Sequence, residues 1–371
     1  MQIDEMYHSL EEPGNSQQTQ VKEQHYSLLL LASIHNTVMA TDGLYKNESY
    51  NNCTQVDVLM KRYYLPVMYG TIFAVGLVGN TTSIGIYVAK MRPWKSSSII
   101  MLNLAVTDLL YVLSMPFLVY YYTNGDSWTM GDFMCRFVRF GFHFNLYGSI
   151  LFLTCLSVFR YVVVVHPLRA AQVQKKSWGV VACLMVWAVA AAEITPMLTM
   201  ITMVEENNKT QCLDFASNDP RDLWWYGWLL TVLGYLLPLA VVFLCYFCIV
   251  RALARGPHTR SPARVRARRL TVLILVVFVA CFMPYHVLRV LRVDTRRRPV
   301  PCMMWRWVHA AYIISRPVAG LNTFFNLALY TLAGDKFQQA FLSVFHWKNW
   351  LSKPEPHTAV AVISKPASST L

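Results

Sequence analysis

Five basic side chains stand at helical spacing within the apolar parts of this chain. Arg139 and His143 are four residues apart and His286 and Arg289 are three apart, so each pair lies on one face of a helix. Arg316 follows in a later apolar stretch. A planar guanidinium binds a carboxylate through two parallel hydrogen bonds, and two guanidinium groups can hold both ends of a short dicarboxylate. These residues therefore predict a binding site for a small dianion.

Further side chains complete the expected site. We expect Arg139, Arg289 and Arg316 to bind the ligand, the two histidines to donate hydrogen bonds and Tyr122 to add a hydroxyl. From Arg289 to Arg316 the chain carries seven arginines and one acid, Asp294. The remaining five arginines are expected to be solvated loop charges that raise the local concentration of anions. They are Arg292, Arg296, Arg297, Arg298 and Arg306.

Simpler interpretations of these residues remain open. Arg139 or Arg316 would be neutralised if it paired with an acid of this chain. The acids considered are Glu193, Glu205, Glu206 and Asp214. His143 would be a packing residue if its ring only filled space. The sequence has no His-Glu-x-x-His motif, phosphate-binding glycine loop or nucleophile elbow, so we expect no enzymatic activity.

The composition indicates which elements carry these residues. The 371-residue chain is 55% hydrophobic and only 14% charged, which is too apolar for an ordinary soluble surface. Buried helices of a large soluble protein would be the alternative, but they would leave almost no polar face. Seven apolar runs are long enough to cross a bilayer: 65–89, 98–122, 137–159, 178–203, 224–250, 270–293 and 307–333. The sequence thus predicts an all-α membrane protein, a seven-transmembrane helix bundle with a short amphipathic helix after span seven.

Four spans contain prolines that are expected to kink them, because proline removes a backbone donor. These prolines are Pro116, Pro196, Pro238 and Pro284 in spans two, four, five and six. The predicted organisation is an extracellular tail (1–62), the bundle (63–334), the amphipathic helix (335–346) and a cytoplasmic tail (347–371).

Basic residues gather in alternate loops, which predicts the orientation of the bundle. They are Lys90, Arg92 and Lys95, then Arg169, Lys175 and Lys176, then seven arginines from Arg251 to Arg269. Positive charge marks the cytoplasmic side, so the N-terminus is expected outside the cell. The net charge of +13 is therefore mostly membrane-flanking, and no nucleic-acid partner is expected.

The predicted outer side carries sites for covalent modification. Three glycosylation sequons begin at Asn47, Asn52 and Asn208. Four cysteines, Cys53, Cys135, Cys212 and Cys302, also lie on this side, where disulfides persist. Three pairings are possible and spacing alone does not prove one. We favour Cys135 with Cys212 and Cys53 with Cys302, and we expect the five cysteines within spans to be packing residues.

Several short motifs occur in order on these spans. They are Gly79-Asn80, Asn103-Leu104-Ala105-Val106-Thr107-Asp108, Cys135 with Phe159-Arg160-Tyr161, Trp187, Pro238 with Tyr246, and Cys281-Phe282-Met283-Pro284. With them the chain resembles a rhodopsin-like (class A) G-protein-coupled receptor over roughly residues 63–346. Two positions depart from that family. Phe159 stands where an acid is usual, and the segment Asn326-Leu327-Ala328-Leu329-Tyr330 lacks the usual proline.

The resemblance implies roles for residues below the anion site. Arg160, Tyr246 and Tyr330 would couple the receptor to a heterotrimeric G protein, with arrestin and membrane lipids as further partners. Asp108 would hold an allosteric sodium ion together with Ser149, Asn322 and Asn326. The alternative is a protonated or water-bonded Asp108. No other metal or cofactor is expected.

A finer resemblance narrows the ligand. It rests on Lys90-Met91-Arg92-Pro93-Trp94-Lys95-Ser96-Ser97, Gly131-Asp132-Phe133-Met134-Cys135, His143-Phe144-Asn145-Leu146-Tyr147 and Ala267-Arg268-Arg269-Leu270-Thr271. These segments are similar to the receptors for small carboxylates and nucleotides. They imply a plasma-membrane receptor for a dicarboxylate, first of all 2-oxoglutarate, that signals through Gq and calcium. A succinate or nucleotide receptor is the alternative within the family, and a dicarboxylate transporter is the alternative outside it.

Overall fold

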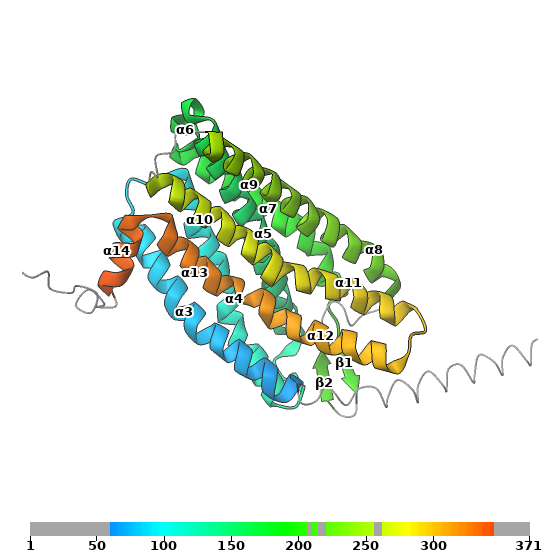
Figure 1. Ribbon diagram of the computed structural model, residues 1–371. Helices are drawn as coiled ribbons and strands as arrows, with labels where there is room; N and C mark the ends of the chain where they lie inside the picture. Colours follow the sequence, from blue (N-terminus) through cyan, green and yellow to red (C-terminus); the bar gives the residue numbers. More distant parts are fainter. Residues whose placement is uncertain (1–59, 207–208, 214–219, 256–261, 345–371) are drawn as a thin grey trace, which may run out of the picture.

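A computed structural model describes residues 60–206, 209–213, 220–255 and 262–344 of the chain. Long helices run side by side through this part, and a two-stranded hairpin covers one end of them (Figure 1). The first half contains η1 (Met60–Tyr64), α3 (Leu65–Lys90), α4 (Ser96–Thr123), α5 (Gly131–Val165), α6 (Pro167–Val173), α7 (Lys176–Met200), β1 (Met203–Glu206) and β2 (Lys209–Cys212). The second half contains α8 (Pro220–Thr231), η3 (Val232–Leu236), α9 (Leu237–Arg255), α10 (Pro262–Val277), η4 (Phe278–Phe282), α11 (Met283–Arg297), α12 (Cys302–Gly320), α13 (Asn322–Ala333) and α14 (Asp335–Val344).

Six helical stretches of the described residues are long and apolar enough to cross a membrane. They are Met60–Lys90, Ser96–Thr123, Gly131–Val165, Lys176–Met200, Leu223–Arg255 and Val265–Arg297. The first six predicted spans are confirmed, and most of these helices extend beyond the apolar run that predicted them. The fourth span is the exception, because its helix ends at Met200 and the chain enters β1 at Met203.

The seventh predicted span consists of two consecutive helices rather than one. The α12 helix ends at Gly320, α13 begins at Asn322, and the N–H of Leu321 donates to the carbonyl of Pro317 over 3.0 Å. Pro317 lies inside α12 and lacks a backbone donor of its own. The chain therefore crosses the bundle with an interruption that the sequence analysis did not anticipate.

A π-helical turn precedes two of the prolines that were expected to kink their helices. In η3 and η4 the first residue after the turn bonds five residues back, Leu237 to Val232 and Met283 to Phe278. Each turn ends two residues before a proline of the following helix, Pro238 or Pro284. A π turn accommodates the carbonyl groups that the proline ring would otherwise crowd, and such turns are frequent at functional sites.

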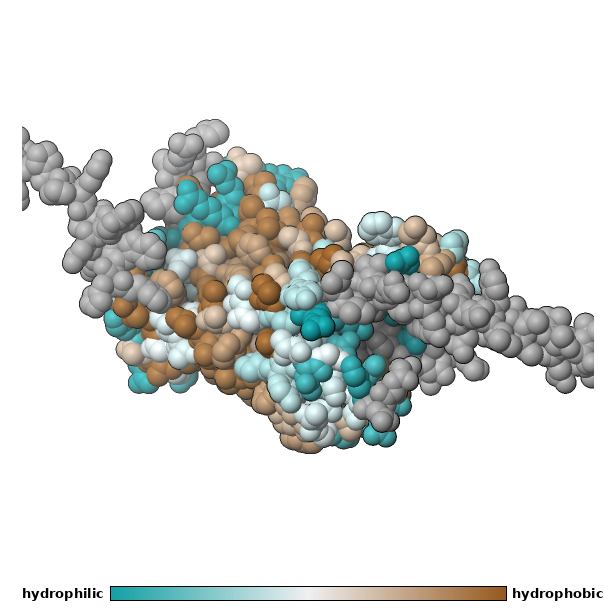
Figure 2. Space-filling view, turned by 90° about the horizontal axis from the view of Figure 1, so that it is seen from below, coloured by the Kyte–Doolittle hydropathy of each residue, from teal (hydrophilic) through white to brown (hydrophobic). Residues whose placement is uncertain are grey.

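The helices form one bundle with apolar side chains on its exterior. Helix α5 packs against α4, α7 and α9 and has a largely buried face. The bundle exposes many large hydrophobic side chains, mostly Val, Leu, Phe, Met and Trp. Hydrophobic residues gather over the middle of the face seen in Figure 2, with hydrophilic residues toward its two ends. This is the surface that a membrane-spanning bundle presents to lipid.

The hairpin is tied to the bundle by a disulfide. Strands β1 and β2 are antiparallel, with Met203 opposite Cys212. Cys212 is bonded to Cys135 at the start of α5, with their Cα atoms 5.8 Å apart, so this predicted bridge is confirmed. Cys53, the predicted partner of Cys302, lies outside the described residues, and that pairing stays a prediction. The five cysteines within spans are free.

Several predicted features lie wholly or partly outside the described residues. The three sequon asparagines, Asn47, Asn52 and Asn208, are among them, as are both tails. The amphipathic helix is present as α14, and its residue Phe337 is buried against Tyr87, with ring centres 4.9 Å apart. Its predicted last two residues, 345–346, are not described.

Candidate functional site

Arg289 is the most deeply buried cation near the hairpin end of the bundle. This α11 residue has no exposed surface, and it is held by bonds to two other helices. One Nη donates to the Tyr147 hydroxyl over 2.6 Å, and the other donates to Thr231 Oγ1 over 2.9 Å and the Gly227 carbonyl over 3.2 Å. Its Nε has no hydrogen-bond partner among the described residues. The guanidinium is thus fixed in position with donor capacity left.

Arg139 and Arg316 meet at Tyr122. Both arginines are only 6% exposed, and both lie within electrostatic range of the Tyr122 ring. Arg316 donates to the Tyr122 hydroxyl over 3.3 Å, and Arg139 donates to the backbone carbonyl of Cys212 over 2.7 Å. Helices α4, α5 and α12 therefore bring these three predicted residues together.

Tyrosine rings connect this pair of arginines to Arg289. The Arg316 guanidinium lies 5.6 Å from the centre of the Tyr312 ring, and the Tyr312 and Tyr285 rings are 6.0 Å apart. Arg289 in turn lies 5.6 Å from the centre of the Tyr285 ring. The faces of aromatic rings attract cations, so these tyrosines help to hold three like charges in one region.

The two predicted histidines occupy different positions in this arrangement. His143 Nδ1 bonds to the Arg139 carbonyl and Nε2 bonds to the Tyr285 hydroxyl, each over 2.9 Å. Since the carbonyl can only accept, Nδ1 carries a proton and donates it to the Arg139 carbonyl. His143 thereby orients Tyr285, because both of its nitrogens are engaged within the protein.

His286 instead has donor capacity left. Its Nδ1 lies 3.4 Å from an Arg289 Nη, and its ring stacks on Tyr235 with centres 4.5 Å apart. The guanidinium can only donate, so Nδ1 accepts and the neutral ring carries its proton on Nε2. That Nε2 has no hydrogen-bond partner in the described part of the chain.

Arg292 corrects one expectation from the sequence. The sequence predicts a solvated loop charge, but Arg292 is 5% exposed and its guanidinium lies 4.6 Å from the centre of the Trp305 ring. Helix α11 continues to Arg297, so Arg292 stays on the inward face one turn beyond Arg289. Arg297 and Arg298 are exposed as expected, and Arg298 pairs with Asp294 over 3.2 Å.

The acids considered as internal partners lie in different places. Glu193 is half-buried on α7, and its backbone carbonyl accepts a hydrogen bond from Tyr226. Glu205 is exposed on β1. The side chain of Glu206 and all of Asp214 are outside what the structure describes. Among these acids, Glu193 is therefore the one that the structure places within the bundle.

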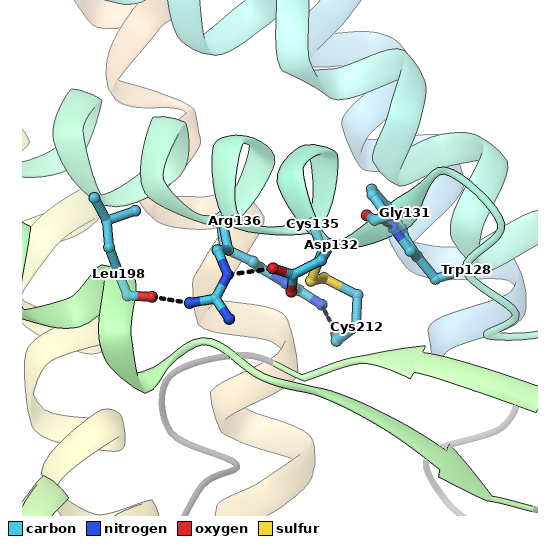
Figure 3. The surroundings of a disulfide bond; sticks show 8 residues. Trp128, Gly131, Asp132, Cys135, Arg136, Leu198 and Cys212 are labelled. Atoms are coloured by element: carbon cyan, nitrogen blue, oxygen red, sulfur yellow. Dashed lines mark hydrogen bonds and ion pairs between the residues drawn. A yellow bond between two sulfur atoms is a disulfide. The ribbon is translucent and has the colours of Figure 1, made fainter.

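The disulfide and the residues around it hold the β1–β2 hairpin against the start of α5, over the candidate site (Figure 3). Arg136 bonds to Asp132 over 2.7 Å and donates to the carbonyl of Leu198, which joins the start of α5 to the end of α7. The same disulfide that anchors β2 places the Cys212 carbonyl against Arg139. The hairpin is thus part of the candidate site, and a displaced hairpin would release Arg139 from this carbonyl.

A second polar cluster lies deeper in the bundle around Asp108. Both carboxylate oxygens accept hydrogen bonds of 2.9 Å, one from Asn145 and one from Asn326. Three more buried oxygens have no hydrogen-bond partner among the described residues: Ser149 Oγ, Asn322 Oδ1 and Asn326 Oδ1. A carboxylate with several unsatisfied oxygens fits a hard cation such as sodium. No cluster of three or more His, Cys, Asp or Glu that could hold a metal occurs in the described ranges.

The residues expected to couple to a G protein lie on three different helices. Arg160 of α5 and Tyr246 of α9 are half-buried, whereas Tyr330 of α13 is fully buried with its ring 5.9 Å from that of Tyr87. No hydrogen bond joins these three residues to one another in the described part of the chain. The structure therefore keeps Tyr330 packed within the bundle, near α14.

The missing proline of span seven has a visible packing consequence. Leu327 occupies that position, and a Cβ on Gly79 would lie 2.3 Å from Leu327 Cδ1. Helices α3 and α13 approach this closely only because residue 79 has no side chain. Helix α13 continues without a break from Asn322 to Ala333.

The structure adds residues to the site that the sequence analysis did not select. Tyr147, Tyr285, Tyr312 and Thr231 contact the arginines, and Asn145 contacts Asp108. Tyr147 and Asn145 lie in the same segment as His143, within about one turn of it. That spacing is the signal that could have drawn attention to both.

Comparisons with known proteins give consistent matches across the bundle. Residues 79–330 match the family model of the 7 transmembrane receptor (rhodopsin family). The chain is 52% identical to 2-oxoglutarate receptor 1 of Rattus norvegicus over 298 residues, 80% of this chain and 88% of that protein. It is 50% identical to 2-oxoglutarate receptor 1 of Mus musculus, over 83% of this chain and 92% of that protein. It is 37% identical to a purinoceptor of Gallus gallus, over 84% of this chain and 88% of that protein.

Proposed function

Because the chain belongs to the rhodopsin family of seven-transmembrane receptors, we propose that it is a plasma-membrane receptor for a small dicarboxylate, 2-oxoglutarate in the first place. Its N-terminus and the β1–β2 hairpin lie outside the cell in this proposal, and the arginine site opens toward that side. The ligand activates a heterotrimeric G protein of the Gq family, which raises cytosolic calcium, and arrestin ends the signal. Catalysis has no place in this proposal.

The observation that carries the proposal is the convergence of Arg139, Arg289 and Arg316 on one group of tyrosine rings. Three positive charges gathered in a buried region repel one another, and a dianion bound between them would relieve that repulsion. Forked guanidinium donors match the planar carboxylates at both ends of such a ligand. The names of the two rodent relatives reported above support 2-oxoglutarate as that ligand.

A calcium assay in transfected cells tests the proposed ligand. Cells expressing the full chain are expected to respond to 2-oxoglutarate at lower concentrations than to succinate, glutarate or adenine nucleotides. A Gq-selective inhibitor is expected to remove the response. The nucleotide arm matters because a purinoceptor is also a relative. A response to adenine nucleotides alone would show that a nucleotide, and not a dicarboxylate, is the ligand. Uptake of labelled 2-oxoglutarate into vesicles, with no guanine-nucleotide exchange on a G protein, would indicate a transporter.

We also propose that the Asp108 cluster binds sodium and thereby opposes activation. Replacing Asp108 by asparagine removes the charge while keeping the shape, and it is expected to abolish the sodium dependence of the agonist EC50. In the wild-type receptor, exchange of sodium for choline at constant ionic strength is expected to lower the EC50 by about fivefold, the lower end of typical allosteric coupling. An equal sodium effect in both proteins would exclude Asp108 as the ligand of the ion.

A further inference from the structure

Glu193 lies beside the Arg289 end of the anion site, in contact with span five at Gly234. A Cβ built on Gly234 would lie 2.5 Å from Tyr147 Cε1 and 3.6 Å from Glu193 Oε2. The Tyr147 ring and the Glu193 carboxyl group therefore share the space left by the missing side chain. Gly234 belongs to the π-helical turn η3, where the regular helix of span five is interrupted.

Tyr147 links this carboxyl group to Arg289. Its hydroxyl accepts the 2.6 Å hydrogen bond from Arg289, and its ring lies within electrostatic range of both Arg289 and Glu193. Tyr226 donates to the backbone carbonyl of Glu193 and is within electrostatic range of the same two charges. We call Glu193, Tyr147, Tyr226 and Arg289 the Glu193 cluster; it joins α7, α5, α8 and α11.

The two charges of the cluster are not joined by a direct bond. Glu193 Oε2 is buried and has no hydrogen-bond partner among the described residues, and the same holds for Arg289 Nε. Burial has removed the water from this oxygen, so the charge of the half-buried carboxylate is screened less than it would be at the surface. Tyr147 and Tyr226 each lie within electrostatic range of both Glu193 and Arg289, so Arg289 is the cation of this cluster. A ligand anion at Arg289 therefore meets a negative charge that the protein already holds nearby.

We propose that Glu193 determines which anions the Arg289 end of the site accepts, favouring singly charged carboxylates over phosphates. The inference rests on the proposed dicarboxylate receptor and adds a selectivity residue to it. Repulsion from Glu193 grows in proportion to the charge of the ligand group. A phosphate carries about −1.5 to −2 at neutral pH, and an alkylphosphonate, a weaker acid, carries between one and two negative charges, so each is opposed up to twice as strongly as a carboxylate. Glu193 acts on the ligand through space and not by direct contact, so it is a selectivity residue.

Glutarate and 4-phosphonobutyrate are matched probes for this idea, since they differ only in the replacement of one carboxylate by a phosphonate. The variant E193Q keeps the shape of the side chain and removes its charge. We expect E193Q to lower the EC50 for glutarate by about fivefold. The repulsion energy is proportional to the charge of the ligand group, so doubling that charge squares the fold-change. The EC50 for 4-phosphonobutyrate should therefore fall by up to about 25-fold. Should the phosphonate not activate, its inhibition of the 2-oxoglutarate response is measured instead.

Two control variants separate charge from structure. E193D keeps the charge and is expected to keep the wild-type ratio of the EC50 values for the two probes. E205Q removes an exposed acid of β1 and is expected to leave the same ratio unchanged. Surface expression is measured for each variant. If E193Q does not reach the surface, Glu193→Ser removes the same charge with a smaller side chain. A folding defect alone would change both probes equally.

The outcomes distinguish the inference from the function on which it rests. A wild-type receptor that responds to 2-oxoglutarate, with an unchanged probe ratio after removal of the Glu193 charge, would overturn the selectivity role alone. A wild-type receptor that responds to no dicarboxylate would overturn the proposed function, and the inference with it. A rise in the relative potency of the phosphonate, absent from E193D and E205Q, is the result expected.

Discussion

Replacing Arg316 by leucine is expected to abolish the calcium response to 2-oxoglutarate or to raise its EC50 more than about 30-fold. Arg316 is 6% exposed and donates to Tyr122 beside Arg139. Loss of one partner from a buried, hydrogen-bonded charge pair typically costs about 2–5 kcal/mol, which corresponds to at least that change in affinity. The same substitution at Arg139 is expected to have a similar effect, because that guanidinium lies at the same tyrosine.

The variant Arg316→Lys separates charge from geometry at this position. Lysine keeps the positive charge but offers a point charge in place of a planar fork. We therefore expect an EC50 between those of the wild type and Arg316→Leu, with a maximal response near that of the wild type. Equal potency of the lysine variant and the wild type would show that position 316 supplies charge alone.

Arg306 provides a matched control on the same helix. It lies on α12 as Arg316 does, it is half-buried, and the sequence predicts that it acts only as a solvated charge. Arg306→Leu removes one cation from this end of the bundle and is expected to change the EC50 by less than about threefold. Its charge is partly exposed and lies ten residues, roughly 15 Å along the helix, from Arg316, which is beyond the Debye length. Unchanged potency of Arg316→Leu at normal surface expression would exclude Arg316 from the site.

The sequence was sufficient to predict the spans because each span corresponds to a long apolar run of residues. Their ends were harder to place. Helix α11 continues to Arg297, four residues beyond its apolar run, because its charged last turn faces the end of the bundle. Arg292 lies within that predicted span, three residues after Arg289, so helical spacing alone could have placed it on the inward face against Trp305. The interruption at Leu321 was also missed, since no apolar pattern distinguishes one helix from two in succession.

The cations of the site were predictable, whereas their partners were not. A guanidinium in an apolar span is conspicuous, because burial of a charge needs a reason. Tyr147, Tyr285 and Tyr312 are inconspicuous in the same spans, since tyrosine packs well among apolar residues. Their hydroxyl groups and ring faces acquire a role only when another helix brings an arginine to them. Glu193 illustrates the same limit, because the sequence suggested Arg139 or Arg316 as its partner and the structure places it beside Tyr147.

Loss of the Cys135–Cys212 disulfide is expected to remove the agonist response and to destabilise the protein. The bond joins residues 77 positions apart, and it holds the Cys212 carbonyl that accepts a hydrogen bond from Arg139. By loop-closure entropy such a bond contributes at most about 4.5 kcal/mol. This value is an upper limit here because helices that stay in the membrane have less freedom to lose. We expect Cys135→Ser and Cys212→Ser each to lower the Tm of the purified receptor by about 10 °C or less.

The double variant identifies the bond as the cause. If the effect comes from the disulfide, Cys135→Ser with Cys212→Ser should be no less stable than either single variant, because the bond is lost only once. Cys155→Ser is the matched control, since Cys155 is a free cysteine of the same helix α5, and its Tm and EC50 are expected to stay near those of the wild type. A normal agonist response from the double variant at normal surface expression would mean that the hairpin carbonyl is not needed to hold Arg139. The anion site would then depend on the helices alone.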